Sequence, residues 1–290
     1  MDNLRGIFLV ILSMALFSVE DLWIKQLTVS LPTGQVIGML GMGGMVMFAL
    51  AARFGRSPLW HPAMRHPSFI LRTASEAVAA VCFITSLSLV PLSTVAAVFQ
   101  ATPLAITLGA ALFLGESVGW RRWSAICVGF VGVLIIIRPG VQGFQPQALL
   151  VLGAVLAIAA RDLASRHLPA ALSSVTVSFY GFAALIVAAP FLLLLTGATP
   201  VAMVQPDPLR LLGAVLFGTS GYYTIVLATR VGDASAIMPF RYARLVFSLI
   251  IGMVVLAERP DALTLLGAAI IIASGLYTYL RERRLARASR

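Results

Sequence analysis

The chain has 290 residues, of which 60% are hydrophobic and only 11% are charged, and its formal net charge is +10. Soluble domains carry about 25% charged residues, so this chain has too little polar surface for a water-soluble globule. Composition therefore excludes a soluble enzyme, a disordered chain and a two-domain globular fold. It predicts an all-α integral membrane protein. We attribute the positive surplus to arginines in cytoplasmic loops and expect no nucleic-acid partner.

The apolar residues lie in blocks of about 20, the length that a helix needs to cross ~30 Å of hydrocarbon. We interpret the first block as a retained span, because it is longer than the apolar core of a signal peptide and lacks an Ala-x-Ala cleavage site. The sequence predicts ten transmembrane helices. In chain order they cover residues 5–27, 33–52, 68–89, 93–115, 121–138, 147–167, 172–195, 209–229, 234–256 and 261–280.

The distribution of arginine predicts that both termini are cytoplasmic. With the N-terminus inside, most arginines fall in cytoplasmic segments, and only Arg138, Arg210 and Arg259 fall on the opposite side. We therefore expect a multi-pass protein of the inner membrane. Its basic tail, residues 283–290, is expected to contact anionic lipid.

The two halves of the chain resemble each other. SVEDLWIKQL at 18–27 aligns with AARDLASRHL at 159–168, which pairs Asp21 with Asp162 at an offset of 141. Residues 95–117 align with AIMPFRYARLVFSLIIGMVVLAER, residues 236–259, at an offset of 142, which pairs Glu116 with Glu258. Five spans per repeat is an odd number, so the second repeat must be inverted in the membrane. We expect a first repeat at 1–140, a second at 141–282 and the tail at 283–290. Inverted repeats are typical of secondary transporters, whose substrate site lies near the midplane between the halves.

The same residues carry a family resemblance. The ten spans, the stretch at 88–140 and its counterpart at 234–282, with Glu116 and Glu258, resemble the drug/metabolite transporter superfamily, EamA type. Members of that superfamily move amino acids, riboflavin, nucleotide sugars and other metabolites, mostly outward in bacteria. In size and span number the chain is similar to the aromatic amino-acid exporters among them. The resemblance implies ATP-independent export of aromatic or other neutral amino acids, or of related small metabolites, by alternating access.

Two alternatives remain open. The first is a carrier of anionic metabolites, such as phosphorylated or nucleotide-linked compounds. The second is a membrane-embedded enzyme or a lipid-handling protein. We find no catalytic motif, no cofactor motif and no metal-ligand spacing in the sequence, and we expect a small-molecule substrate and the bilayer as partners. A monomer is compatible with these features.

We single out nine ionisable residues within the expected spans, each of which would cost about 2.5–3.5 kcal/mol if it faced lipid. We therefore expect them to line a wet cavity or to pair with one another. For Asp21 and Asp162, the alternative to substrate contact is an intrahelical pair with Lys25 and Arg166, one turn further on. The nine are Glu20, Asp21, Lys25, Glu76, Arg161, Asp162, Arg166, Arg241 and Arg244.

The strongest candidates for substrate contact are Arg241 and Arg244, three positions apart on one face of the ninth span. Two guanidinium groups suit a carboxylate or a phosphate. Glu76 is their expected counter-ion, or else it binds a substrate ammonium or a coupling proton. Pro103 and Pro239 are expected to interrupt their helices, as is tolerated where a cavity is lined. The full candidate set, for which ordinary packing is the alternative at the aromatic positions, is Asp21, Glu76, Phe99, Gln100, Asp162, Tyr223, Arg241, Tyr242 and Arg244.

Overall fold

A computed structural model describes residues 3–115, 119–139, 145–231 and 237–288, and over these ranges it contains helices and no strand. Seven of the described helical segments are long and apolar enough to cross a membrane. A further apolar helix, Trp123–Ile137, is shorter. The expectation of an all-α membrane protein is confirmed, while the number of ten spans and the side of the termini stay predictions.

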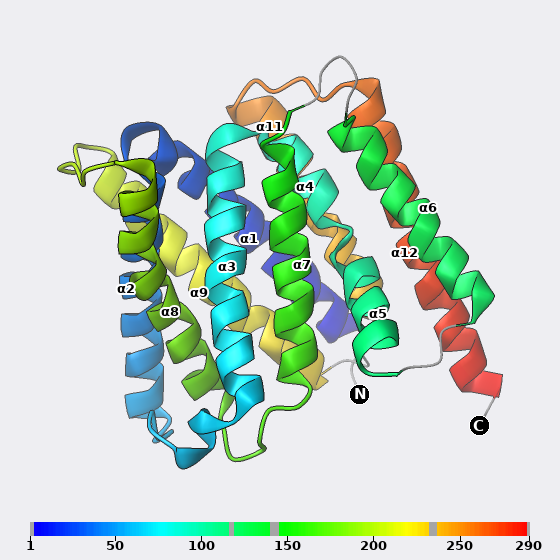
Figure 1. Cartoon of the computed structure of the whole chain (residues 1–290), viewed down its shortest axis with the longest axis horizontal. Coiled ribbons are helices and arrows are strands. Elements are labelled where there is room, and N and C mark those ends of the chain that lie inside the picture. The colour runs from blue at the N-terminus through cyan, green and yellow to red at the C-terminus, as the bar shows by residue number, and fades with distance from the viewer. Residues whose placement is uncertain (1–2, 116–118, 140–144, 232–236, 289–290) are drawn as a thin grey trace. The chain divides into compact units, whose positions relative to one another are not determined.

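The helices follow the ten expected blocks (Figure 1). The fourth block contains two helices in succession, and the ninth begins as a short 3-10 helix. The described helices are α1 (Asn3–Ser30), α2 (Thr33–Phe54), α3 (Pro67–Leu89), α4 (Leu92–Phe99), α5 (Thr102–Phe113), α6 (Trp120–Ile137), α7 (Ala148–Ser165), α8 (Ser174–Thr196), α9 (Asp207–Val231), α11 (Ala243–Val255) and α12 (Ala262–Ala288), with 3-10 helices η1 (Pro62–Arg65) and η2 (Met238–Tyr242).

Both interruptions lie where proline was expected to cause them. α4 ends at Phe99 and α5 starts at Thr102, with Pro103 in its first turn. Pro239 lies in η2, which passes directly into α11 at Ala243. Proline lacks an N–H group and clashes with the preceding turn, so it kinks or breaks a helix. At the repeat offset the two breaks coincide to within a residue, and paired interruptions of this kind commonly mark a transporter's binding site.

The chain forms two compact units, and each takes segments from both halves of the sequence. Unit 1 consists of Met1–Leu22, Val90–Leu149 and Phe217–Arg290, and unit 2 of Trp23–Leu89 and Leu150–Leu216.

Close approach of small residues holds the helices of unit 1 together. α6 and α12 run side by side (Figure 1), and a Cβ atom on Gly132 would lie 2.8 Å from the carbonyl oxygen of Gly267. Val10 and Met14 of α1 form a buried apolar cluster with Ala228 of α9 and with Ile237. Helices in lipid associate mainly through such close packing, because lipid and side chains are equally apolar.

Unit 2 is built in the same way. α2 packs along α8, where Gly41 and Gly44 meet the backbone and ring of Phe182. These glycines belong to the run GMLGMGGM, residues 38–45. Small residues in that run therefore serve helix packing.

Candidate functional site

In unit 1, α1 presents polar side chains to α11. Ser18 Oγ lies 3.1 Å from Ser248 Oγ and 3.3 Å from the carbonyl oxygen of Arg244. Both serine side chains are fully buried. Because these hydrogen bonds fix α11 beside α1, the next residue on this face of α1, Asp21, lies opposite Arg244.

Asp21 and Arg244 form a buried, bidentate ion pair. Arg244 Nη2 lies 2.8 Å from Oδ2 and 2.9 Å from Oδ1 of Asp21, and Arg244 Nε lies 3.2 Å from Oδ2. The two side chains are 4% and 15% exposed, respectively. Charge-assisted bonds in this fork geometry are among the strongest in proteins, and desolvation is their cost.

Two aromatic rings flank the guanidinium group of Arg244. Its central carbon lies 5.3 Å from the ring centre of Phe17 and 5.0 Å from that of Phe99. These distances are within the range of cation–π attraction. Phe99 is the last residue of α4, so the helix break borders the ion pair.

Gln100 directly follows Phe99 and carries an unused donor. The residue is 6% exposed, and its Nε2 atom is buried with no hydrogen-bond partner among the described residues. A buried donor without an acceptor costs about 1–3 kcal/mol, so such groups are rare outside functional sites.

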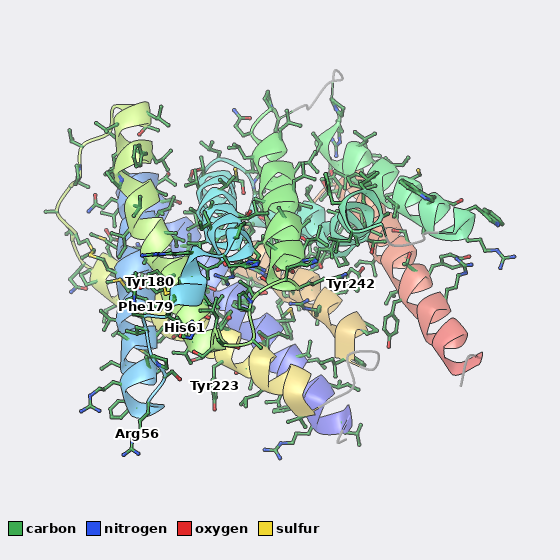
Figure 2. The ribbon with its side chains drawn as sticks, turned by 60° about the horizontal axis from the view of Figure 1, so that its bottom comes forward. Arg56, His61, Phe179, Tyr180, Tyr223 and Tyr242 are labelled. Atoms are coloured by element: carbon green, nitrogen blue, oxygen red, sulfur yellow. The ribbon has the colours of Figure 1, made fainter. Side chains whose placement is uncertain are left out.

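The remaining candidates in unit 1 are Arg241, Tyr242 and Tyr223, which differ in exposure. Arg241 is exposed, and Tyr242 is half-buried with its hydroxyl group against Gly275 of α12. Tyr223 is 64% exposed, and its ring points away from α9 (Figure 2). The structure therefore brings Asp21, Phe99 and Arg244 into contact and leaves Tyr223 apart from them.

Glu76 and Asp162 lie in unit 2, in a second charge network. Glu76 binds Arg72 and Arg161, each at 3.1 Å, and Arg161 binds Asp162 at 2.8 Å. Arg72 also donates to the carbonyl oxygen of Val177 at 2.9 Å. The two acids and two bases balance in charge.

These partners differ from those expected for the same acids. Glu76 pairs with the arginines of unit 2, so it is not the counter-ion of Arg244, whose partner is Asp21. Asp162 pairs with its chain neighbour Arg161. Neither aspartate forms the expected intrahelical pair: Lys25 instead donates to the carbonyl oxygen of Leu87 at 2.9 Å. Asp21 therefore pairs with a residue of another helix, whereas Asp162 pairs locally, with Arg161 in place of Arg166.

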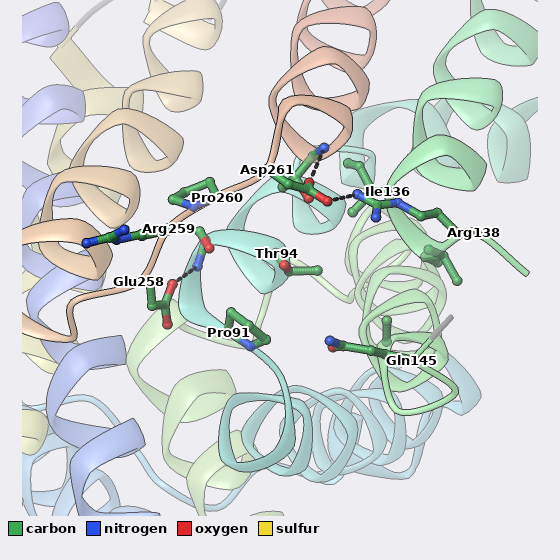
Figure 3. A pocket seen from close by; sticks show the side chains of 13 residues that line it. Pro91, Thr94, Ile136, Arg138, Gln145, Glu258, Arg259, Pro260 and Asp261 are labelled. Carbon is green, nitrogen blue, oxygen red and sulfur yellow. Dashed lines mark hydrogen bonds and ion pairs between the residues drawn. The ribbon is translucent and has the colours of Figure 1, made fainter. Parts of the chain in front are cut away.

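A pocket of about 230 Å³ lies at the start of α4 in unit 1 (Figure 3). Glu258 lines it and accepts hydrogen bonds from the backbone N–H groups of Leu92 at 2.6 Å and Ser93 at 2.9 Å. The first N–H groups of a helix have no partner within it, and they carry partial positive charge. Glu258 thus caps α4. Its repeat counterpart, Glu116, lies outside the described residues.

The backbone before Glu258 turns in a left-handed conformation. Ala257 has φ 52°, and Gly115, its equivalent 142 positions earlier, has φ 65°. On the far side of the pocket Arg138 pairs with Asp261, which also accepts a hydrogen bond from the N–H group of Thr264 at 2.8 Å. The hydrogen bond from Arg138 lowers the pKa of Asp261 to about 2.

Sequence reasoning left several of these residues out of the site. Phe17 resembled an ordinary apolar position, and Glu258 was noted only as a repeat marker. Arg72, near the start of the third expected span, was counted with the cytoplasmic arginines. Glu20 and Arg161 did carry a signal, as charges within apolar blocks. Among the described residues, no group of three His, Cys, Asp or Glu side chains is placed to hold a metal ion.

Apolar helices, paired helix interruptions and buried ion pairs define a membrane transporter. The EamA-like transporter family model matches residues 4–138 and again residues 145–280, and the chain belongs to this family. It is a multi-pass protein of the inner membrane.

Several relatives of the chain are named as transporters, each for a different substrate. The S-adenosylmethionine uptake transporter of Rickettsia prowazekii (strain Madrid E) is 27% identical over 97% of this chain and 94% of its own length. The riboflavin transporter of Vibrio cholerae is 34% identical over 67% of this chain and 64% of its own length. The pseudopaline exporter CntI of Pseudomonas aeruginosa is 26% identical over 92% of this chain and 93% of its own length. Among the solved structures that match, a crystal structure has a TM-score of 0.62 at 19% identity and covers 97% of this chain and 98% of its own. This likeness bears on the fold alone.

Proposed function

We propose that the chain is a secondary, ATP-independent carrier of a small metabolite that bears an amino-acid head group, with S-adenosylmethionine as the leading candidate. The observation that carries the proposal is the buried Asp21–Arg244 pair, placed between aromatic rings at a helix break. Neutral and aromatic amino acids, the expectation from sequence, are the rival substrates within the same class.

The pair suits a zwitterion because each member matches one end of it. A substrate carboxylate takes the fork of Arg244, while the substrate ammonium takes the carboxylate of Asp21. One buried pair is thereby exchanged for two, so no charge is left uncompensated. Phe17 and Phe99 offer ring faces to a planar base or an aromatic side chain. The unused amide donor of Gln100 suits a further acceptor on the substrate.

The relatives support this choice of substrate class. One is named for uptake of S-adenosylmethionine, which combines an amino-acid head with an adenine ring, and others for riboflavin and pseudopaline. A carrier of anionic metabolites is less well supported, because the guanidinium group of Arg244 already has a carboxylate neighbour.

The proposal includes the wider architecture. Ten spans form two inverted repeats, 1–140 and 141–282, with the tail 283–290 and both termini in the cytoplasm. The repeats rock in alternating access around the site, and the substrate gradient sets the direction of net flux. Tyr242, Arg241, Glu76, Asp162 and Tyr223 stay candidates for substrate contact on other steps of the cycle.

Counterflow in reconstituted vesicles tests the proposal. Vesicles are preloaded with unlabelled S-adenosylmethionine, methionine, phenylalanine, riboflavin or a nucleoside monophosphate, and uptake of the labelled compound is followed without ATP. We expect saturable exchange of S-adenosylmethionine. Exchange of the nucleotide alone would support the anionic alternative. Phospholipid movement or turnover without any exchange would support an enzyme or lipid-handling protein.

A further inference from the structure

Glu20 lies beside the Asp21–Arg244 pair but faces another helix. Ser13, Phe17 and Glu20 form one row along α1 that packs on α9. Ser13 Oγ donates to the carbonyl oxygen of Gly221 at 2.7 Å, and a Cβ atom on Gly221 would lie 3.1 Å from the Phe17 ring. A Cβ atom on Gly218 would overlap Glu20 Oε1, so the carboxylate occupies the space that this glycine leaves.

The three charges at this point do not balance. Arg244 directs its Nε and Nη2 atoms to the two oxygens of Asp21, and both carboxylates are attracted to this same guanidinium group. In the described part of unit 1, no ion pair reaches Glu20. Arg241, one turn before Arg244, is exposed. When both carboxylates are ionised, the cluster of Glu20, Asp21 and Arg244 has a formal charge of −1, a state that is costly away from water.

Glu20 is also placed to meet a ligand. It is only partly buried, and the ring of Phe17, one turn before it on the same row, lies against the guanidinium group of Arg244. A cationic group that enters beside Arg244 would find a carboxylate on one side and an aromatic face on the other, the two surroundings that onium groups prefer.

We infer that Glu20 selects the substrate by net charge, binding a positive group that lies beyond the amino-acid head. This inference rests on the proposed function. A zwitterionic head leaves the cluster charge unchanged, whereas a substrate with one additional positive charge neutralises it. S-adenosylmethionine has such a charge on its sulfonium group. S-adenosylhomocysteine differs from it by the loss of one methyl group and of that charge.

This pair of compounds provides the test. Counterflow of each is measured for the wild-type protein, Glu20→Gln and Glu20→Asp, with the membrane potential clamped at zero. We expect the wild-type protein to prefer the sulfonium compound by about tenfold, since a partly buried charge pair exceeds the ~1.4 kcal/mol that this ratio represents. Glu20→Gln should lose the preference and keep exchange of S-adenosylhomocysteine, and Glu20→Asp should retain most of the preference.

The outcomes separate the inference from the function on which it rests. Wild-type preference that persists in Glu20→Gln overturns the inference and leaves the proposed function intact. If Glu20→Gln keeps the preference for the sulfonium compound but loses uptake driven by a pH gradient, the inference is also overturned. Glu20 would then carry a coupling proton. Failure of the wild-type protein to exchange either compound contradicts both. Size-exclusion profiles and thermal melts show whether each variant is folded, and Glu20→Ala, which also removes the carboxylate, provides the same test if Glu20→Gln is not.

Discussion

Arg244 on α11 holds both carboxylate oxygens of Asp21 on α1, although the two residues are 223 positions apart in the chain. The pair joins the first helix of the first repeat to the interrupted helix of the second. An ion pair buried to this degree stabilises little by itself, because desolvation offsets most of its attraction. Its position at a helix break and between two rings suits the ligand exchange proposed above.

Loss of Arg244 should stop transport. Arg244→Ala leaves Asp21 as an unpaired buried carboxylate and removes the fork for the substrate carboxylate. Counterflow should fall by about 100-fold, and Arg244→Lys, which keeps charge but not the bidentate geometry, should cost about tenfold. Initial rates in vesicles of equal protein content give the measurement.

A double variant without charge at this pair separates an effect on transport from an effect on folding. Asp21→Asn combined with Arg244→Gln removes the two paired charges together and leaves the net charge of the cluster unchanged, so the melting temperature should stay near that of the wild-type protein. Counterflow should still be lost. A double variant that transports normally would exclude the pair from the site.

In unit 2, Glu76 should matter first for stability. Glu76→Gln removes the carboxylate shared by Arg72 and Arg161, of which Arg72 is almost fully buried. Breaking a buried pair on one side costs about 3–5 kcal/mol, and partial exposure of Glu76 and Arg161 should reduce that figure. We expect a clear fall in melting temperature, larger than for Asp162→Asn, whose carboxylate contacts Arg161 alone among the partners described. Equal melting temperatures for the two variants would contradict this ranking.

Ala257 and Gly115 offer a matched pair of substitutions at equivalent positions. Both have positive φ, a conformation that costs an alanine about 1 kcal/mol relative to glycine. Ala257→Gly should therefore raise the free energy of unfolding by about that amount, and Gly115→Ala should lower it. No atom lies within 4 Å of a Cβ atom built on Gly115, so steric overlap does not confuse the comparison. Shifts of the same sign would contradict the assigned backbone conformation.

Stability should fall in acid through Asp261. Its hydrogen bond from Arg138 lowers its pKa from 3.8 to about 2 in the folded protein. Because the unfolded chain binds the proton more tightly, this stabilisation is complete above pH ~4 and is lost as the pH falls toward ~2. The side chain is half exposed, so the effect should be small. Thermal melts of the purified protein over this range, with Asp261→Asn as the insensitive control, measure it.

Local signals predicted the elements well. Apolar blocks anticipated the helices, and Pro103 and Pro239 anticipated both interruptions, because helix length and proline geometry depend on neighbouring residues alone. The same local signals could not predict which residues form ion pairs with each other. Asp21 lies one turn from Lys25 in the sequence, yet it binds Arg244, a choice that depends on which helices pack together. Glu258 showed no sign of its partner either, because it caps α4 through backbone groups that any residue possesses.

The most direct test of the central claim is equilibrium binding of S-adenosylmethionine to the purified protein by titration calorimetry. The account predicts saturable binding to the wild-type protein. It predicts no detectable binding to the folded double variant, Asp21→Asn with Arg244→Gln. Equal affinity of the two proteins would contradict a substrate site at the Asp21–Arg244 pair.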